Sequence, residues 1–127
     1  MIRNIIATDK APAAIGPYAQ ANAAGEFIFT SGQIPIDPAT GKLVEGGIEE
    51  QTRQVFANLK AVLEAGGSDL SRVIKTTCFM ADLGDFARMN QIYAEYFPDG
   101  AYPSRSAFQV GALPMGAMIE IEAIAMK

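Results

Sequence analysis

Arg105 and two glutamates, Glu120 and Glu122, are the residues of this chain whose types and spacing can support chemistry on a small anion. Arg105 lies in the segment 103–106, about one strand before the glutamates. A guanidinium can hold a carboxylate through two parallel hydrogen bonds, and a glutamate can orient or activate a water molecule. The pairing suits hydrolysis of a small organic acid. A surface arginine and a half-solvated strand face would account for the same short motif without any chemistry.

Length and composition indicate one globular domain over residues 1–127. Half of the residues are apolar and 19% are charged, which is slightly hydrophobic for a soluble protein. No apolar run approaches the roughly 18 residues that would span a bilayer, and the N-terminus lacks a charged-then-apolar signal pattern. We therefore expect a cytoplasmic protein without a membrane partner.

The residue inventory excludes several kinds of chemistry. The chain has no histidine and one cysteine, Cys78, so Ser-His-Asp triads, Cys/His couples, and histidine or thiolate metal sites are excluded. Cys78 lies in an apolar segment, where we expect a buried, inert thiol. No Gly-rich phosphate-binding motif is present, so we expect neither a cofactor nor a metal. The net charge of −4 argues against a nucleic-acid partner.

Residue periodicity predicts an α+β fold with the order β-β-β-α-β-α-β-β. A helical apolar stripe from Ile48 to Leu63 predicts the first helix, which Gly66 and Gly67 close. Asp85 is a plausible N-cap for the second helix, which ends before Pro98. A turn is predicted at 37–42. The predicted strands are 3–7, 18–23, 26–31, 73–80, 105–111 and 118–126.

Two helices inserted in one mixed sheet most simply pack on one face and leave the other uncovered. Alternation along the last strand divides its side chains between the two faces. The set expected under the helices is Ile119, Ile121, Ala123 and Ala125, and the opposite set is Met118, Glu120, Glu122, Ile124 and Met126. The second set is too apolar to be left in water, so we expect a homo-oligomer with both glutamates near a subunit boundary.

The order of several short motifs resembles the YjgF/RidA family over essentially the whole chain. These motifs are Gly16-Pro17-Tyr18, Ser31-Gly32-Gln33-Ile34-Pro35, Pro103-Ser104-Arg105-Ser106, Leu113-Pro114 and the segment 119–125. The resemblance implies a single chorismate-mutase-like domain that assembles as a homotrimer, with small 2-imino or 2-oxo acids bound in clefts between subunits. It also implies hydrolysis of 2-imino acids or their enamine tautomers, such as 2-iminobutanoate, 2-iminopropanoate and 2-aminoacrylate, to 2-oxo acids and ammonia.

The resemblance further implies roles for single residues. Arg105 would clamp the substrate carboxylate, Glu120 would hold or activate water, and Tyr18 would reach the site from its loop. The substrate-binding positions would be Ser31, Gly32, Ala107 and Asn90. Each has an alternative structural role: Tyr18 can pack on the sheet, Ser31 and Gly32 can end a strand, and Asn90 can lie on a solvated helix flank.

One position departs from the family pattern, because many deaminase members carry cysteine where this chain has Ala107. A backbone contact there would survive the change, whereas a role for the thiol would not. Two other function classes stay open. One is a non-catalytic sensor of 2-oxo acids that uses the same arginine. The other is an endoribonuclease, which the acidic charge and the absence of histidine disfavour.

Overall fold

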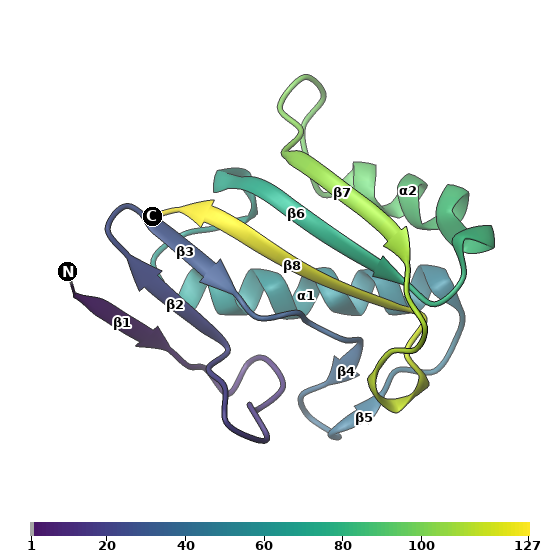
Figure 1. Cartoon of the computed structure of the whole chain (residues 1–127), viewed down its shortest axis with the longest axis horizontal. Coiled ribbons are helices and arrows are strands. Elements are labelled where there is room, and N and C mark those ends of the chain that lie inside the picture. The colour runs from purple at the N-terminus through teal and green to yellow at the C-terminus, as the bar shows by residue number, and fades with distance from the viewer. Residues whose placement is uncertain (1) are drawn as a thin grey trace.

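A six-stranded sheet organises the chain, of which the computed structural model describes residues 2–127 (Figure 1). The strand order is β1-β2-β3-β8-β6-β7. The strands are β1 (Arg3–Ile6), β2 (Ala21–Ala24), β3 (Phe27–Thr30), β6 (Val73–Met80), β7 (Ser104–Gln109) and β8 (Ile119–Met126). β6 and β7 are parallel and the other neighbours are antiparallel. The predicted mixed sheet and the order of its elements are confirmed.

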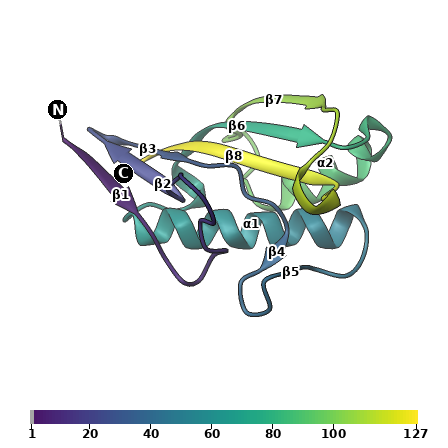
Figure 2. The same cartoon turned by 60° about the horizontal axis from the view of Figure 1, so that its bottom comes forward.

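Both long helices, α1 (Ile48–Ala65) and α2 (Phe86–Glu95), lie on the same face of this sheet (Figure 2). The apolar stripe of α1 is buried against β8 and β3, with Phe56 at its centre. Phe56 stacks on Tyr96 and makes edge contacts with Tyr93 and Phe97. Tyr93 belongs to α2, and the other two residues directly follow this helix. Aromatic packing therefore joins the two helices.

Within residues 2–127, no helix lies over the other face of the sheet. Along β8 the predicted alternation is confirmed: the isoleucines and alanines at 119, 121, 123 and 125 are buried, while Glu120 and Glu122 are half-buried. Four large apolar side chains on the uncovered face are each at least 40% exposed, namely Phe27, Phe29, Phe108 and Met126. Burying such a face stabilises a protein in water, so it is suited to contact with another chain.

Several predicted bounds and connections differ from the structure; β7, for example, ends at Gln109 and not at residue 111. The strand expected at 18–23 begins only at Ala21, because the side chain of Gln20 binds loop backbone instead of continuing the sheet. The turn predicted at 37–42 is flanked by a small separate hairpin, β4 (Ile36–Asp37) and β5 (Lys42–Leu43). Asp85 directly precedes α2 as predicted, but its side chain makes no capping hydrogen bond.

Three short 3-10 turns complete the connections, at Leu70–Arg72, Leu83–Asp85 and Pro114–Gly116. The last of these lies in the loop between β7 and β8. Within residues 2–127, no helix is long and apolar enough to cross a membrane.

Candidate functional site

Arg105 lies on the edge strand β7 and points to the helix side of the sheet, where it meets α2. Its Nη1 donates a hydrogen bond to Asn90 Oδ1 at 2.6 Å. A cavity of about 480 Å³ opens beside this pair and is lined by Asn90, Tyr93, Tyr102 and Arg105, with Ala94 and Pro103. We call these four residues the arginine half-site. Asn90 lies on an exposed flank of α2, as its alternative role predicted, and from there it accepts a hydrogen bond from the guanidinium.

The Arg105 guanidinium lies over two aromatic rings of α2. Its central carbon lies 4.7 Å from the ring centroid of Tyr93 and 5.2 Å from that of Phe86. Tyr93 is fixed by a 2.7 Å hydrogen bond between its hydroxyl and that of buried Thr76. Burial raises the pKa of Tyr93 above its ordinary value, so its hydroxyl stays neutral. A flat cation stacked on fixed rings is held in one orientation.

Glu120 lies at the start of β8 on the uncovered face, directly against Gly32. A Cβ atom at position 32 would collide with the Glu120 carboxylate, so only glycine allows this approach. Backbone hydrogen bonds in both directions between Gln33 and Ile121, at 2.9 and 3.1 Å, hold the two segments together. We call Tyr18, Ser31, Gly32 and Glu120 the glutamate half-site.

The environment of Glu120 favours its protonated form more than water would. Partial burial raises the pKa of the Glu120 carboxyl above its ordinary value, and the nearby charge of Glu122 raises it further. A carboxylate with a raised pKa is a stronger base and accepts a proton from water more readily. The position of Glu120 therefore suits a general base, a role that the sequence left open beside that of orienting water.

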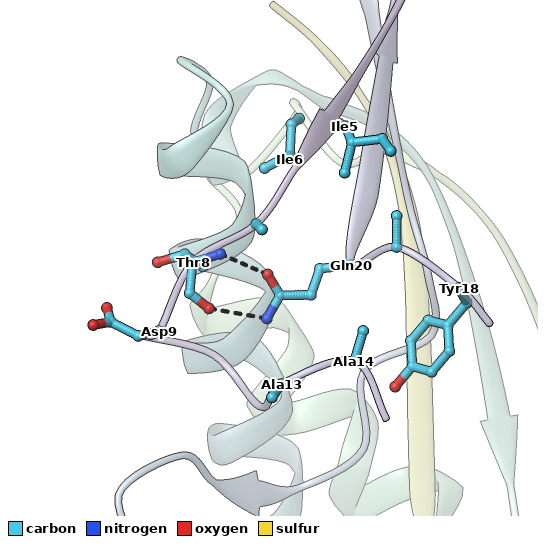
Figure 3. A pocket seen from close by; sticks show the side chains of 10 residues that line it. Ile5, Ile6, Thr8, Asp9, Ala13, Ala14, Tyr18 and Gln20 are labelled. Atoms are coloured by element: carbon cyan, nitrogen blue, oxygen red, sulfur yellow. Dashed lines mark hydrogen bonds between the residues drawn. The ribbon is translucent and has the colours of Figure 1, made fainter. Parts of the chain in front are cut away.

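The loop that carries Tyr18 is tied to Ser31 and to the N-terminal segment. Ser31 Oγ donates to Ala19 O at 2.6 Å, and Ser31 N donates to Gln20 O at 2.9 Å. Buried Gln20 accepts from Thr8 N at 2.7 Å and donates to Thr8 O at 3.0 Å, as Figure 3 shows. The Ser31 hydroxyl is thus occupied in holding the loop, and the Tyr18 side chain, about half exposed, is left free to contact a ligand.

The two half-sites lie on opposite faces of the sheet. In the strand register Arg105 is paired with Thr76, which is buried under the helices, whereas Glu120 is paired with Phe79 on the uncovered face. β6 separates the two strands that carry them. A small acid held by Arg105 therefore does not reach Glu120 of the same chain. The sequence placed both groups in one site, and a single copy of the fold does not bring them together.

Ala107 lies two residues beyond Arg105 on the same side of β7, and its register partner on β6 is Cys78. Cys78 is fully buried, and burial raises the pKa of its thiol to about 11. The expectation of an inert thiol is confirmed, and Cys78 does not replace the cysteine missing at position 107. Within residues 2–127, no group of three or more acidic or cysteine side chains is placed to hold a metal ion.

Comparison with known proteins identifies the family. The family model described as Endoribonuclease L-PSP matches residues 8–127. The chain belongs to this family. The resemblance to YjgF/RidA proteins is confirmed by a mouse relative named 2-iminobutanoate/2-iminopropanoate deaminase, which is 50% identical over 100% of this chain and 93% of its own length.

Solved structures of Rid proteins have the same fold. A Rid family protein from Yersinia pestis, whose function is described as unknown, superposes with a TM-score of 0.96 at 47% identity, covering 99% of this chain and 100% of its own. The Escherichia coli protein TdcF, solved with bound serine, has a TM-score of 0.91 at 43% identity, covering 98% of each chain. Both likenesses extend over nearly the whole chain, so the α+β fold of the Rid family is shared in full.

Proposed function

We propose that this Rid family protein hydrolyses small 2-imino acids, or their enamine tautomers, to 2-oxo acids and ammonia. The observation that carries the proposal is the complementary chemistry of the two half-sites: a pre-oriented guanidinium and a half-buried carboxylate of raised pKa. The name of the mouse relative supports the reaction class, and the serine bound to TdcF supports a ligand with a carboxylate and a nitrogen on the adjacent carbon.

The reaction needs only positioning and one acid/base group. Arg105 holds the substrate carboxylate, and Glu120 removes a proton from water as the water oxygen bonds to the imine carbon. The C=N electron pair moves to nitrogen, and Glu120 returns its proton there. The hydroxyl proton of the tetrahedral intermediate then passes to the amino nitrogen, the C–N bond breaks, and ammonia leaves the 2-oxo acid. The Tyr18 hydroxyl, on the loop beside Gly32, stabilises the intermediate by a hydrogen bond.

We further propose that each site forms between two copies of the chain in a homotrimer. Arg105 lies on the edge strand β7, so a second copy whose uncovered sheet face packs along that edge would bring its Glu120 to the guanidinium. The apolar residues of that face and the separation of the half-sites within one chain both support this arrangement.

Mixed oligomers test the shared site. Arg105→Ala and Glu120→Ala should each lower kcat/KM for 2-iminobutanoate generated in situ by about 100-fold or more, since each removes a charged group from the transition state. Arg88→Ala, an exposed arginine of α2 outside the cavity, is the matched control and should keep its activity. When the two inactive variants are unfolded, mixed equally and refolded, random assembly gives about a quarter of sites with both groups intact.

Recovery of about a quarter of wild-type activity is therefore expected from the mixture. A site contained within one chain would give none, because every chain lacks one group. Glu120→Ala should also keep its affinity for 2-oxobutanoate within a few-fold while losing rate. A wild-type protein that binds 2-oxo acids but does not accelerate imine hydrolysis would instead be a sensor.

The family description also names an endoribonuclease. An RNA-cleaving site would draw on clustered basic residues, whereas the ten Lys and Arg side chains are dispersed along a chain of net charge −4. RNA cleavage by the purified protein that Glu120→Ala or Arg105→Ala abolishes would favour that function over deamination.

A further inference from the structure

A small apolar cavity of about 170 Å³ adjoins the glutamate half-site. Its walls include Ile15, Tyr18, Ile34 and Met115, and Gly32 contributes to its lining. Because Gly32 lies directly against the Glu120 carboxylate, the cavity begins next to the proposed base. A substrate carbon attacked near Glu120 would therefore place its substituents at the mouth of this cavity.

The backbone conformation of Met115 is unusual for a residue other than glycine. Its φ of 59° lies in the left-handed region, where, within residues 2–127, every other residue of positive φ is a glycine. Hydrogen bonds from Gly116 N to Leu113 O at 3.2 Å and from Ala117 N to Pro114 O at 3.1 Å close the turn around it. The side chain is 59% exposed, so burial in a core does not account for this conformation. Unfavourable backbone of this kind is concentrated at functional sites.

We propose that this cavity, which we call the side-chain subsite, binds the aliphatic side chain of the 2-imino acid and that Met115 limits the length it accepts. The inference rests on the proposed deaminase function. Apolar walls favour a hydrocarbon substituent over a charged one. The volume is below the roughly 300 to 1,000 Å³ of typical ligand pockets, which suits one side chain of a substrate and not a whole ligand.

A larger cavity nearby is less suited to this role. It has a volume of about 630 Å³ and lies beside β1, with Ile5, Asp9 and Ala14 among its lining residues (Figure 3). It shares Ala13, Tyr18 and Gln20 with the side-chain subsite, but neither Gly32 nor Met115 lines it. The smaller cavity is therefore the one that can select substrates.

Shortening Met115 tests the assignment. In Met115→Ala, the ratio of kcat/KM for the imino acid of leucine to that for the imino acid of alanine should rise about tenfold or more, because single methylenes in apolar pockets change specificity by at least that factor. Met115→Gly should show the same change, and glycine accepts the positive φ, so this variant serves if alanine impairs folding. Leu83→Ala, an exposed residue outside both cavities, should leave the ratio unchanged.

Binding of the product acids separates this proposal from the proposed reaction. Calorimetry should show that Met115→Ala improves affinity for 4-methyl-2-oxopentanoate relative to 2-oxopropanoate. That shift in a protein without imine hydrolysis would support the subsite and reject the deaminase function. Active wild-type and variant proteins with the same kinetic and binding ratios would overturn the role of Met115.

Discussion

Arg105 and Glu120 are prepared for chemistry in different ways. Arg105 donates one hydrogen bond to Asn90 and lies over the rings of Tyr93 and Phe86, and a guanidinium has further N–H donors for a ligand. Glu120 has no such partner among its described contacts, and its reactivity comes from partial burial and from the charge of Glu122. Contacts with α2 therefore orient the Arg105 guanidinium, whereas burial and a neighbouring charge set the basicity of the Glu120 carboxylate.

The rate of imine hydrolysis should depend on the ionisation of Glu120. Only the carboxylate form accepts a proton from water, so kcat/KM, corrected for the uncatalysed reaction, should rise with pH through the pKa of Glu120. Because burial and Glu122 raise that pKa, the midpoint of the rise should lie above 4.5, the ordinary glutamate value. Glu122→Gln removes one of the two causes and should shift the midpoint to lower pH, as stopped-flow pH profiles would measure.

Glu49→Gln is the control for this shift, because Glu49 is an exposed acid in the first turn of α1, away from both half-sites. It should leave the midpoint unchanged. A profile that Glu122→Gln does not alter would mean that another group sets the acid limb.

At the scale of elements, α1 positions the segment that follows the glutamate half-site. Asn58, buried in the middle of α1, donates from Nδ2 to Ile34 O at 3.0 Å and to Ile36 O at 2.9 Å. Gln54 Nε2 donates to Asn58 Oδ1 at 2.9 Å and completes its hydrogen bonding. One helix side chain thus anchors the chain between Gly32 and the β4–β5 hairpin.

Asn58→Ala should destabilise the fold by about 3 kcal/mol, because two carbonyl groups in a poorly hydrated region lose their donor. The loss would appear as a lower urea midpoint at fixed protein concentration, accompanied by reduced activity as the Gly32 segment loosens. Gln54→Ala removes only the bond to Asn58 and should cost less than about 1 kcal/mol. Equal stabilities of the two variants would show that Asn58 does not anchor the segment.

Residue periodicity predicted most of the elements but not their local anchors. The bounds of β6 agree with the prediction, since its β-branched and apolar residues are typical of a strand. The strand predicted from Tyr18 began three residues late, because Gln20 satisfies loop carbonyls that sequence does not place nearby. Tyr93 is a core residue of α2, and its second role under Arg105 depends on the register of β6 and β7. Contacts between segments that are distant in the sequence leave no periodic pattern in it, so periodicity did not predict them.

Residue alternation also predicted part of the candidate site. Alternation along β8 placed Glu120 on the uncovered face, as the structure has it. Arg105 follows Pro103 on a short edge strand with polar residues on both faces, so alternation did not indicate which way it points. Its orientation toward α2 emerges only from the parallel pairing with β6.

At the scale of the whole molecule, the uncovered sheet face has exposed apolar side chains and, among the described residues, a buried polar atom without a hydrogen-bond partner. Phe29, at the middle of β3, is 45% exposed and is flanked in the sheet by Asn22 and Ile124. Among the described residues, Asn22 Oδ1 is buried without a hydrogen-bond donor. A buried acceptor of this kind costs free energy unless another chain supplies a donor. Both features fit a face that is completed by assembly.

Phe29→Asp should therefore dissociate the oligomer, because a carboxylate in an apolar interface loses its hydration without gaining a partner. Multi-angle light scattering should give the mass of a single chain, and deaminase activity should fall although Arg105 and Glu120 are unchanged. Leu83→Asp is the matched control for this variant. Leu83 is also 45% exposed, but it lies before α2, on the helix side. The Leu83 variant should keep the wild-type mass and activity. A monomeric but fully active Phe29→Asp protein would contradict a site shared between copies, because each chain would then have to supply both groups across its own sheet.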